Sequence, residues 1–302
     1  MVPDKRFLRQ PKRFWANVRL LSQHIGYTAR SAKKGSGSIK VPNLAEIIDA
    51  FRAMDLSSVH VCTSPTTLTP FGQILIEYFQ YRAQVLNQQV NQNLMDGAEA
   101  KHEFDTLKQK LEPKCPIPMN KQKGDKRAPA YLSGIVNMLV EANADGLPCN
   151  YNPLELTTFT KDRQPIRTLA RRVDGTFPST VNPVALWEIK EYYYTTSFGS
   201  RVADGVYESL LDGLELENLR EEETINCKHY LIIDARDTWW NDGKSYLCRI
   251  IDMMHMGYVD EVLFGREVIH RLPTLTREWV SLAKERMKSV DPPTITPATT
   301  ND

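Results

Sequence analysis

Cysteine is scarce in this sequence of 302 residues, and no two cysteines stand in a CxxC pair. The chain has five of them, an odd number scattered singly from Cys62 to Cys248. This pattern argues against a disulfide framework and against a structural zinc site. It is typical of a protein in a reducing compartment, and we expect a cytoplasmic location.

Long hydrophobic runs are missing too. No stretch approaches the roughly 20 apolar residues that a membrane span requires, and charges begin at Asp4, before any segment of signal-peptide length. Hydrophobic residues nevertheless make up 41% of the chain and charged residues 25%, as in a globular protein with an apolar core. We therefore expect a soluble globular protein with no membrane partner.

Motifs of several enzyme classes are absent as well. The sequence has no GxxxxGK[ST] loop, no GxGxxG after a predicted strand, no GxSxG elbow and no HExxH helix. Its six histidines show no metal-ligand spacing. Any activity is therefore expected to work without a nucleotide cofactor.

Charge is unevenly distributed behind a net value of +1. Residues 1–40 carry ten Lys and Arg against the single acid Asp4, whereas residues 204–223 are strongly acidic. Lys33 and Lys34 lie in a Gly/Ser/Lys-rich loop of the kind that orders on a phosphate backbone, and a plain surface loop is the alternative. The basic region points to a polyanionic partner, and we expect Lys33 and Lys34 to bind DNA.

Helical periodicity dominates the first part of the chain. It predicts a helix from Phe14 to Ile25, a second beginning after Asn43, and a long one from Pro70 to Leu111. A linker rich in Pro and Lys follows at 113–129. We divide the chain into a helical region, 1–128, with a role in DNA recognition or dimerisation, a core domain, 129–290, and a disordered Pro/Thr-rich tail, 291–302.

The core domain alternates between helix and strand. Helices are predicted at 131–144, 200–211 and 244–256, with a closing helix around Trp279, and strands at 154–160, 166–174, 184–195, 230–234 and 259–264. Residues 176–183 are predicted to form the turn between the second and third of these strands. This order is typical of a mixed α/β domain, in which helices flank a mixed sheet.

One predicted strand carries charges that a buried strand does not tolerate without partners. Side chains alternate along Val184 to Lys190, so Glu188 and Lys190 share one face while Trp187 packs on the other. The hairpin before this strand brings Asp174 beside Glu188. Two converging carboxylates form a hard-oxygen site suited to Mg²⁺, and Lys190 is placed to polarise a water or to stabilise developing negative charge. The alternative is a solvent-facing ion pair on an edge strand.

Asp174 is followed, fourteen positions later, by Glu188-Ile189-Lys190. This pattern resembles the motif of the PD-(D/E)XK nucleases, which include most type II restriction endonucleases. The resemblance covers about residues 130–265. It implies a restriction-endonuclease-like fold in which Asp174 and Glu188 ligate Mg²⁺, the carbonyl of Ile189 adds a ligand, and Lys190 assists the water. Glu141 matches the glutamate that the family often carries on the preceding helix. The family's proline before the first acid is absent, and Val173 stands in its place.

This resemblance implies a type II restriction endonuclease: a Mg²⁺-dependent enzyme that hydrolyses phosphodiester bonds of double-stranded DNA at a short specific site, as a homodimer. We expect Arg201, at a helix start, and Arg236, after a buried strand, to contact the DNA. Two alternatives stay open. One is a repair or anti-phage nuclease on the same scaffold, and the other is a DNA-binding regulator without catalytic activity.

Overall fold

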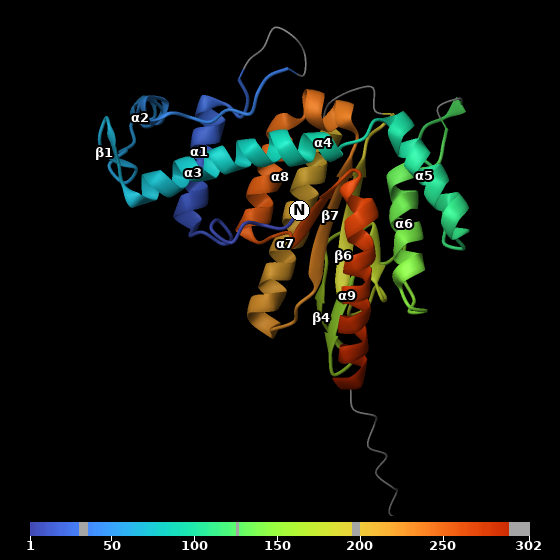
Figure 1. Ribbon diagram of the computed structural model, residues 1–302. Coiled ribbons are helices and arrows are strands. Elements are labelled where there is room, and N and C mark those ends of the chain that lie inside the picture. The colour runs from blue at the N-terminus through green and yellow to red at the C-terminus, as the bar shows by residue number, and fades with distance from the viewer. Residues whose placement is uncertain (30–35, 125–126, 195–199, 290–302) are drawn as a thin grey trace, which may run out of the picture.

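A mixed sheet of four strands lies at the centre of the molecule, with helices on both faces (Figure 1). The computed structural model describes residues 1–29, 36–124, 127–194 and 200–289. The strand order is β5-β6-β7-β8, with β5 antiparallel to β6 and the other neighbours parallel. The strands are β5 Gly175–Phe177, β6 Ala185–Glu191, β7 Lys228–Asp234 and β8 Glu261–Phe264. The fold is therefore of the mixed α/β class, as predicted.

The parallel strands are joined by two crossover helices, α7 Ser200–Glu223 and α8 Lys244–Met256. A short π-helical segment, η3 Asp237–Asp242, leads from β7 into α8. Before the sheet come α5 Gly97–Leu111, α6 Tyr131–Asn143 and a two-stranded ladder of β3 Thr158–Lys161 with β4 Gln164–Thr168. The last helix, α9 Glu267–Ser289, follows β8.

Alternating side chains place a separate core on each face of the sheet. From β7, Tyr230 and Ile232 pack with residues of α5, α6 and α9, while Leu231 and Ile233 pack with residues of α7 and α8. Both faces of a parallel strand are thus buried, which explains the continuous apolar run in β7. The same alternation in β6 turns Trp187 toward α9, where its ring stacks on Trp279 at 5.4 Å, and leaves Glu188 on the α7 face, where it shares Lys190 with Glu208.

The helical N-terminal part forms a third core of its own and is joined to the sheet domain by a buried ion pair. Its elements are α1 Lys12–Ile25, α2 Leu44–Ala53, β1 Cys62–Ser64, β2 Thr67–Leu68 and α3 Pro70–Val85. From α3, Nη1 of Arg82 lies 3.0 Å from Oδ1 of Asp252 in α8, and Tyr78 donates to the same oxygen at 2.6 Å. Arg82 is only 1% exposed, so this contact ties the two parts together across the α3–α8 boundary.

The predicted single helix from Pro70 to Leu111 is wrong. After α3 the chain continues through a π-helical turn, η1 Leu86–Val90, and α4 Asn91–Asn93, and Leu94 then becomes extended. Asp96 caps the new helix α5 in a capping box with Glu99, and the backbone N–H of Met95 donates to the buried carboxylate of Asp234. A contact to β7, 139 residues away in sequence, thus fixes the break.

A second correction concerns the hairpin before β6. The predicted strand 166–174 ends at Thr168, and β5 occupies residues 175–177, the last two of which belong to the predicted turn 176–183. Gly175, Thr176 and Phe177 are all buried in the sheet. The ladder therefore begins directly after Asp174, and the carboxylate lies at the start of a strand rather than at the end of one.

Candidate functional site

Asp174 and Glu188 lie opposite each other across the β5–β6 pair. Gly175 pairs with Trp187, and one step earlier the backbone N–H of Asp174 donates to the carbonyl of Trp187 at 3.1 Å. This register sets Asp174 against Glu188, and Oδ2 of Asp174 accepts from the backbone N–H of Ile189 at 2.8 Å. Like charges directly opposite each other are destabilising in a sheet, so this arrangement requires compensation by a cation.

Lys190 supplies part of that compensation. Its Nζ lies 2.7 Å from Oε2 of Glu188 and 2.7 Å from Oε2 of Glu208, which reaches in from α7. The side chain of Glu188 is 1% exposed and that of Lys190 is 9% exposed. Burial lowers the pKa of Lys190, but Glu188, Asp174 and Glu208 outweigh it and raise the pKa overall, so Lys190 is a cation at neutral pH. The two predicted residues therefore share one buried face of β6, as strand alternation requires.

Two further residues, Arg171 and Asp212, complete the cluster, and neither is predicted from the sequence. Arg171, three positions before Asp174, places Nη1 2.9 Å from Oε1 of Glu188 and 2.7 Å from Oδ2 of Asp212. Its Nη2 lies 3.3 Å from Glu208. Asp212 is fully buried one helical turn beyond Glu208 on α7. The spacing of Glu208 and Asp212, i and i+4 on a helix that follows the motif strand, was the available signal.

Negative charge is in excess in this cluster. Four carboxyl groups, from Asp174, Glu188, Glu208 and Asp212, face two cations, Arg171 and Lys190. Burial, followed by the charge of Glu188, raises the pKa of Asp174 to about 6. Burial also raises the pKa of Asp212 to about 7, against the lowering by Arg171. Oδ1 of Asp212 is buried and accepts no hydrogen bond, and Oε1 of Glu188 is held by the ion pair with Arg171 alone.

Glu141 is not brought into this cluster by any contact that the structure shows. Glu141 lies in the last turn of α6, and its Oε2 accepts from the backbone N–H of Lys114 at 2.9 Å. The acid that meets α6 is Glu191, whose carboxylate accepts from the N–H of Ser133 at 2.7 Å in the first turn of that helix. Burial raises the pKa of Glu191 to about 7, and the charge of Asp174 contributes to the rise.

The residues predicted to bind DNA fall into three situations. Lys33 and Lys34 lie outside the described residues. Arg201 belongs to the first turn of α7, but its side chain also lies outside the described part. Arg236 is described, and it pairs with Glu99 at 3.2 Å and donates to the carbonyl of Leu94. These contacts place the side chain of Arg236, which follows β7 in the chain, against the turn between α4 and α5.

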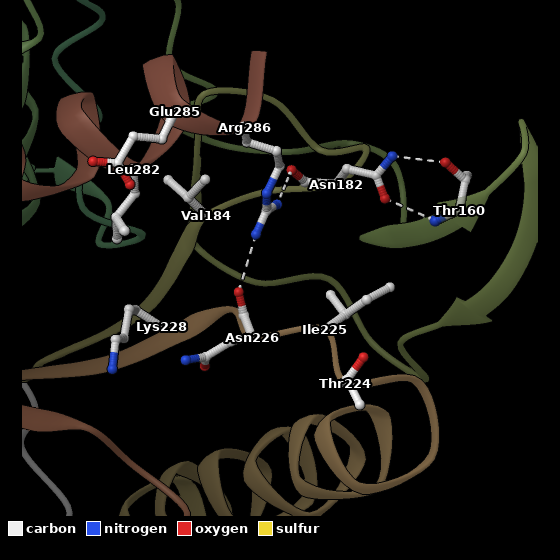
Figure 2. Close-up of a pocket in the computed structure, with 10 residues that line it drawn as sticks. All are labelled: Thr160, Asn182, Val184, Thr224, Ile225, Asn226, Lys228, Leu282, Glu285 and Arg286. Carbon is white, nitrogen blue, oxygen red and sulfur yellow. Dashed lines mark hydrogen bonds between the residues drawn. The ribbon is translucent and has the colours of Figure 1, made fainter. Parts of the chain in front are cut away.

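Within the described residues, no group of three or more His, Cys, Asp or Glu side chains is arranged to hold a metal ion by itself. A groove lies instead at the opposite end of β6 and β7, next to Val184 and Lys228 (Figure 2). Arg286 crosses it and donates to backbone carbonyls of Asn182, Pro183 and Asn226. These contacts are structural, so the charged cluster on β6 and α7 is the candidate site.

A family model described as a domain of unknown function, DUF7687, matches residues 95–279, more than half of the chain. The chain belongs to the DUF7687 family. A second domain of unknown function, DUF7690, matches residues 1–89. Neither a curated protein nor a solved structure matches the chain.

The DUF7687 match contains every member of the charged cluster, and the DUF7690 match contains α1, α2 and α3. The two matches meet between residues 89 and 95, earlier than the division at 128/129 predicted from composition, which stays a prediction. Consistent with the family boundary, α5 packs in the same core as α6 and α9. The predicted tail 291–302 lies outside the described residues. No helix in the described ranges is long and apolar enough to cross a membrane.

Proposed function

We propose that this DUF7687 protein is a Mg²⁺-dependent endonuclease of the PD-(D/E)XK type, and that it acts as a type II restriction endonuclease on double-stranded DNA. The observation that carries the proposal is the pairing of Asp174 with Glu188 across β5 and β6, with Lys190 on the same face. Chain order supports it, since α6, the β5–β6 hairpin, α7 and the parallel strand β7 follow as the resemblance implies.

The chemistry of the donor set fits Mg²⁺. Mg²⁺ is usually bound through one or two carboxylates, with water and substrate phosphate completing the shell, rather than by a cage of protein ligands. Asp174 and Glu188 would hold it, together with the carbonyl of Ile189. The cluster's excess of two carboxylates over cations also favours a divalent cation there. Such an ion would polarise a phosphate oxygen and lower the pKa of a bound water.

Lys190 is assigned an electrostatic role. The carboxylates around it raise its pKa and favour the charged ammonium, which suits Lys190 to the stabilisation of negative charge. Held between Glu188 and Glu208, its Nζ is positioned to stabilise negative charge that develops on the phosphate. Preorganised donors of this kind contribute about a hundredfold to a thousandfold to the rate.

The partners follow from this chemistry. Cutting both strands of a twofold-symmetric site requires two active sites, and we therefore propose a homodimer on double-stranded DNA.

All five cysteines are free thiols, which supports a reducing compartment such as the cytoplasm. A repair or anti-phage nuclease would use the same residues on another DNA substrate.

The test is incubation of the purified protein with phage and plasmid DNA in Mg²⁺, in Mn²⁺ and in EDTA, beside Lys190→Ala. Discrete fragments from the wild type alone, formed only with metal, are expected. Smeared products would favour the repair or anti-phage nuclease. Binding without cleavage in either metal would contradict the nuclease and favour a DNA-binding regulator.

A further inference from the structure

We propose that Arg171 is a built-in counter-cation of the metal site, and that a divalent cation must displace its guanidinium from Glu188 and Asp212 in order to bind. The inference rests on the proposed function and adds that Arg171 competes with the metal ion for the same carboxylates. The relevant acids come from two elements, Glu188 from β6 and Asp212 with Glu208 from α7. Arg171, from the segment before β5, is in contact with all three of them.

The contacts of Arg171 are those that a bound cation would make. Nη1 lies 2.9 Å from Glu188 and 2.7 Å from Asp212, while Nη2 lies 3.2 Å from the second oxygen of Glu188. With Lys190 also on Oε2, each oxygen of Glu188 faces a positively charged group. A metal ion therefore has access to Glu188 only if one of the two cations withdraws.

Burial indicates which cation withdraws. The side chain of Lys190 is 9% exposed and enclosed by Glu188 and Glu208, whereas that of Arg171 is 23% exposed and borders solvent. The backbone beside Arg171 is held independently of the guanidinium, because the N–H of Ala170 donates to Glu215 of α7 at 3.1 Å. The Arg171 side chain can thus leave while its segment stays attached to the helix.

In the free protein, the guanidinium of Arg171 and the metal ion therefore compete for the same site. Occupancy by Arg171 and by the metal oppose each other, so removing the guanidinium raises the affinity for the metal. A coupling of this sort between two cations at one site changes affinity by about tenfold, within the usual range for coupled sites. The neighbouring Arg172 is exposed and makes no contact with the cluster in the described structure, so it is the matched control.

The experiment is a calorimetric titration of Mn²⁺, without DNA, into the wild type, Arg171→Gln, Arg172→Gln and Glu188→Gln. The expected result is a Kd about tenfold lower for Arg171→Gln, an unchanged Kd for Arg172→Gln, and loss of binding for Glu188→Gln. Arg171→Lys keeps the charge but not the two-nitrogen contact, so its Kd for Mn²⁺ should lie between those of the wild type and Arg171→Gln.

Thermal unfolding with and without Mn²⁺ provides a second readout for variants that are less stable in EDTA. The melting temperature of Arg171→Gln is expected to rise more on addition of Mn²⁺ than that of the wild type. Metal binding that depends on Glu188 but is no tighter in Arg171→Gln would overturn this inference and leave the nuclease proposal intact. Absence of Mn²⁺ binding in both wild type and Arg171→Gln would overturn the metal site itself.

Discussion

Glu188 is a carboxylate buried in the middle of a central strand, where an ion is stable only with partners. Strand alternation and the cost of burying charge were sufficient to single out Glu188 and Lys190 from the sequence. Arg171 and Asp212 could not be found in the same way. Their contacts join segments that lie 17 and 41 residues apart in sequence, and the only local sign of either residue is the i, i+4 spacing of Asp212 from Glu208.

Lys190 gives the first prediction. Lys190→Met keeps the length of the side chain and removes its charge, so cleavage is expected to fall by about a hundredfold to a thousandfold through lost transition-state stabilisation. Single-turnover cleavage of plasmid DNA measures this effect. Lys228→Met, at a surface pair with Asp260 away from the cluster, is the control and should cleave at the wild-type rate. Equal rates for the two variants would argue against the role of Lys190.

His255 gives a prediction of pH dependence. Burial lowers its pKa, Nδ1 donates to the carbonyl of Ile251, and Nε2 accepts from the backbone N–H of Asp4. The folded protein therefore favours the neutral ring, although the carboxylates of Asp252 and Asp4 oppose this effect. Stability from this group is present above the unfolded pKa of about 6.5 and is lost as the pH falls toward the lower folded pKa.

We accordingly expect the wild type to lose stability between pH 7 and pH 5. His255→Gln should be less stable than the wild type at pH 7, because the packing of the ring is removed. Its free energy of unfolding should, however, fall less between pH 7 and pH 5. Urea unfolding at a series of pH values measures both slopes. Parallel slopes would show that His255 does not titrate on unfolding.

At the scale of elements, the β5–β6 pair sets the distance between the two acids. A Cβ on Gly175 would lie 2.1 Å from the indole of Trp187, which is buried and stacked on Trp279. Gly175→Ala must therefore separate the strands or displace the indole, at a cost of about 1–3 kcal/mol. Because Asp174 immediately precedes this position, the variant should also bind Mn²⁺ more weakly.

Gly97→Ala is the matched control for Gly175→Ala. A Cβ at Gly97 would meet only Tyr193 at an ordinary 3.6 Å, so we expect no loss of stability and no change in metal affinity. Chemical denaturation and a Mn²⁺ titration of both variants provide the comparison. Retention of wild-type metal affinity in a destabilised Gly175→Ala would indicate that β5 does not position Asp174.

The elements most easily predicted were those with strong local signals. The amphipathic helix α8 occurs over the predicted residues 244–256, and α6 differs from its prediction by one residue. The break before α5 was missed because Asp96 looks like an ordinary polar position in a helical pattern, and the bond from Met95 to Asp234 is long-range. Strand β5 was missed because three residues are too few to show alternation.

At the scale of the whole molecule, the buried pair of Arg82 and Asp252 joins the region matched by DUF7690 to the sheet domain. Arg82→Met leaves Asp252 without its cation, and loss of one member of a buried pair costs about 3–5 kcal/mol. We expect the wild type to unfold in a single transition. The variant should be destabilised by that amount, and a second change, Asp252→Leu, should recover part of the loss.

Urea unfolding followed by circular dichroism and by tryptophan fluorescence tests this coupling, because Trp15 reports on the N-terminal core and Trp187 and Trp279 on the sheet. Two separate transitions in the wild type would mean that the ion pair does not join the parts into one cooperative unit. A double variant no more stable than Arg82→Met would mean that the unpaired charge is not the cause of the loss.

The central claim is that the pair of acids on β5 and β6 makes this molecule a metal-dependent nuclease. The most direct measurement is the rate of plasmid cleavage in Mg²⁺ by Glu188→Gln, a substitution of equal size that also relieves the repulsion with Asp174. We predict a variant that is folded, as judged by circular dichroism, and has no detectable cleavage while the wild type cuts. A folded Glu188→Gln protein that cleaves at the wild-type rate would contradict the claim.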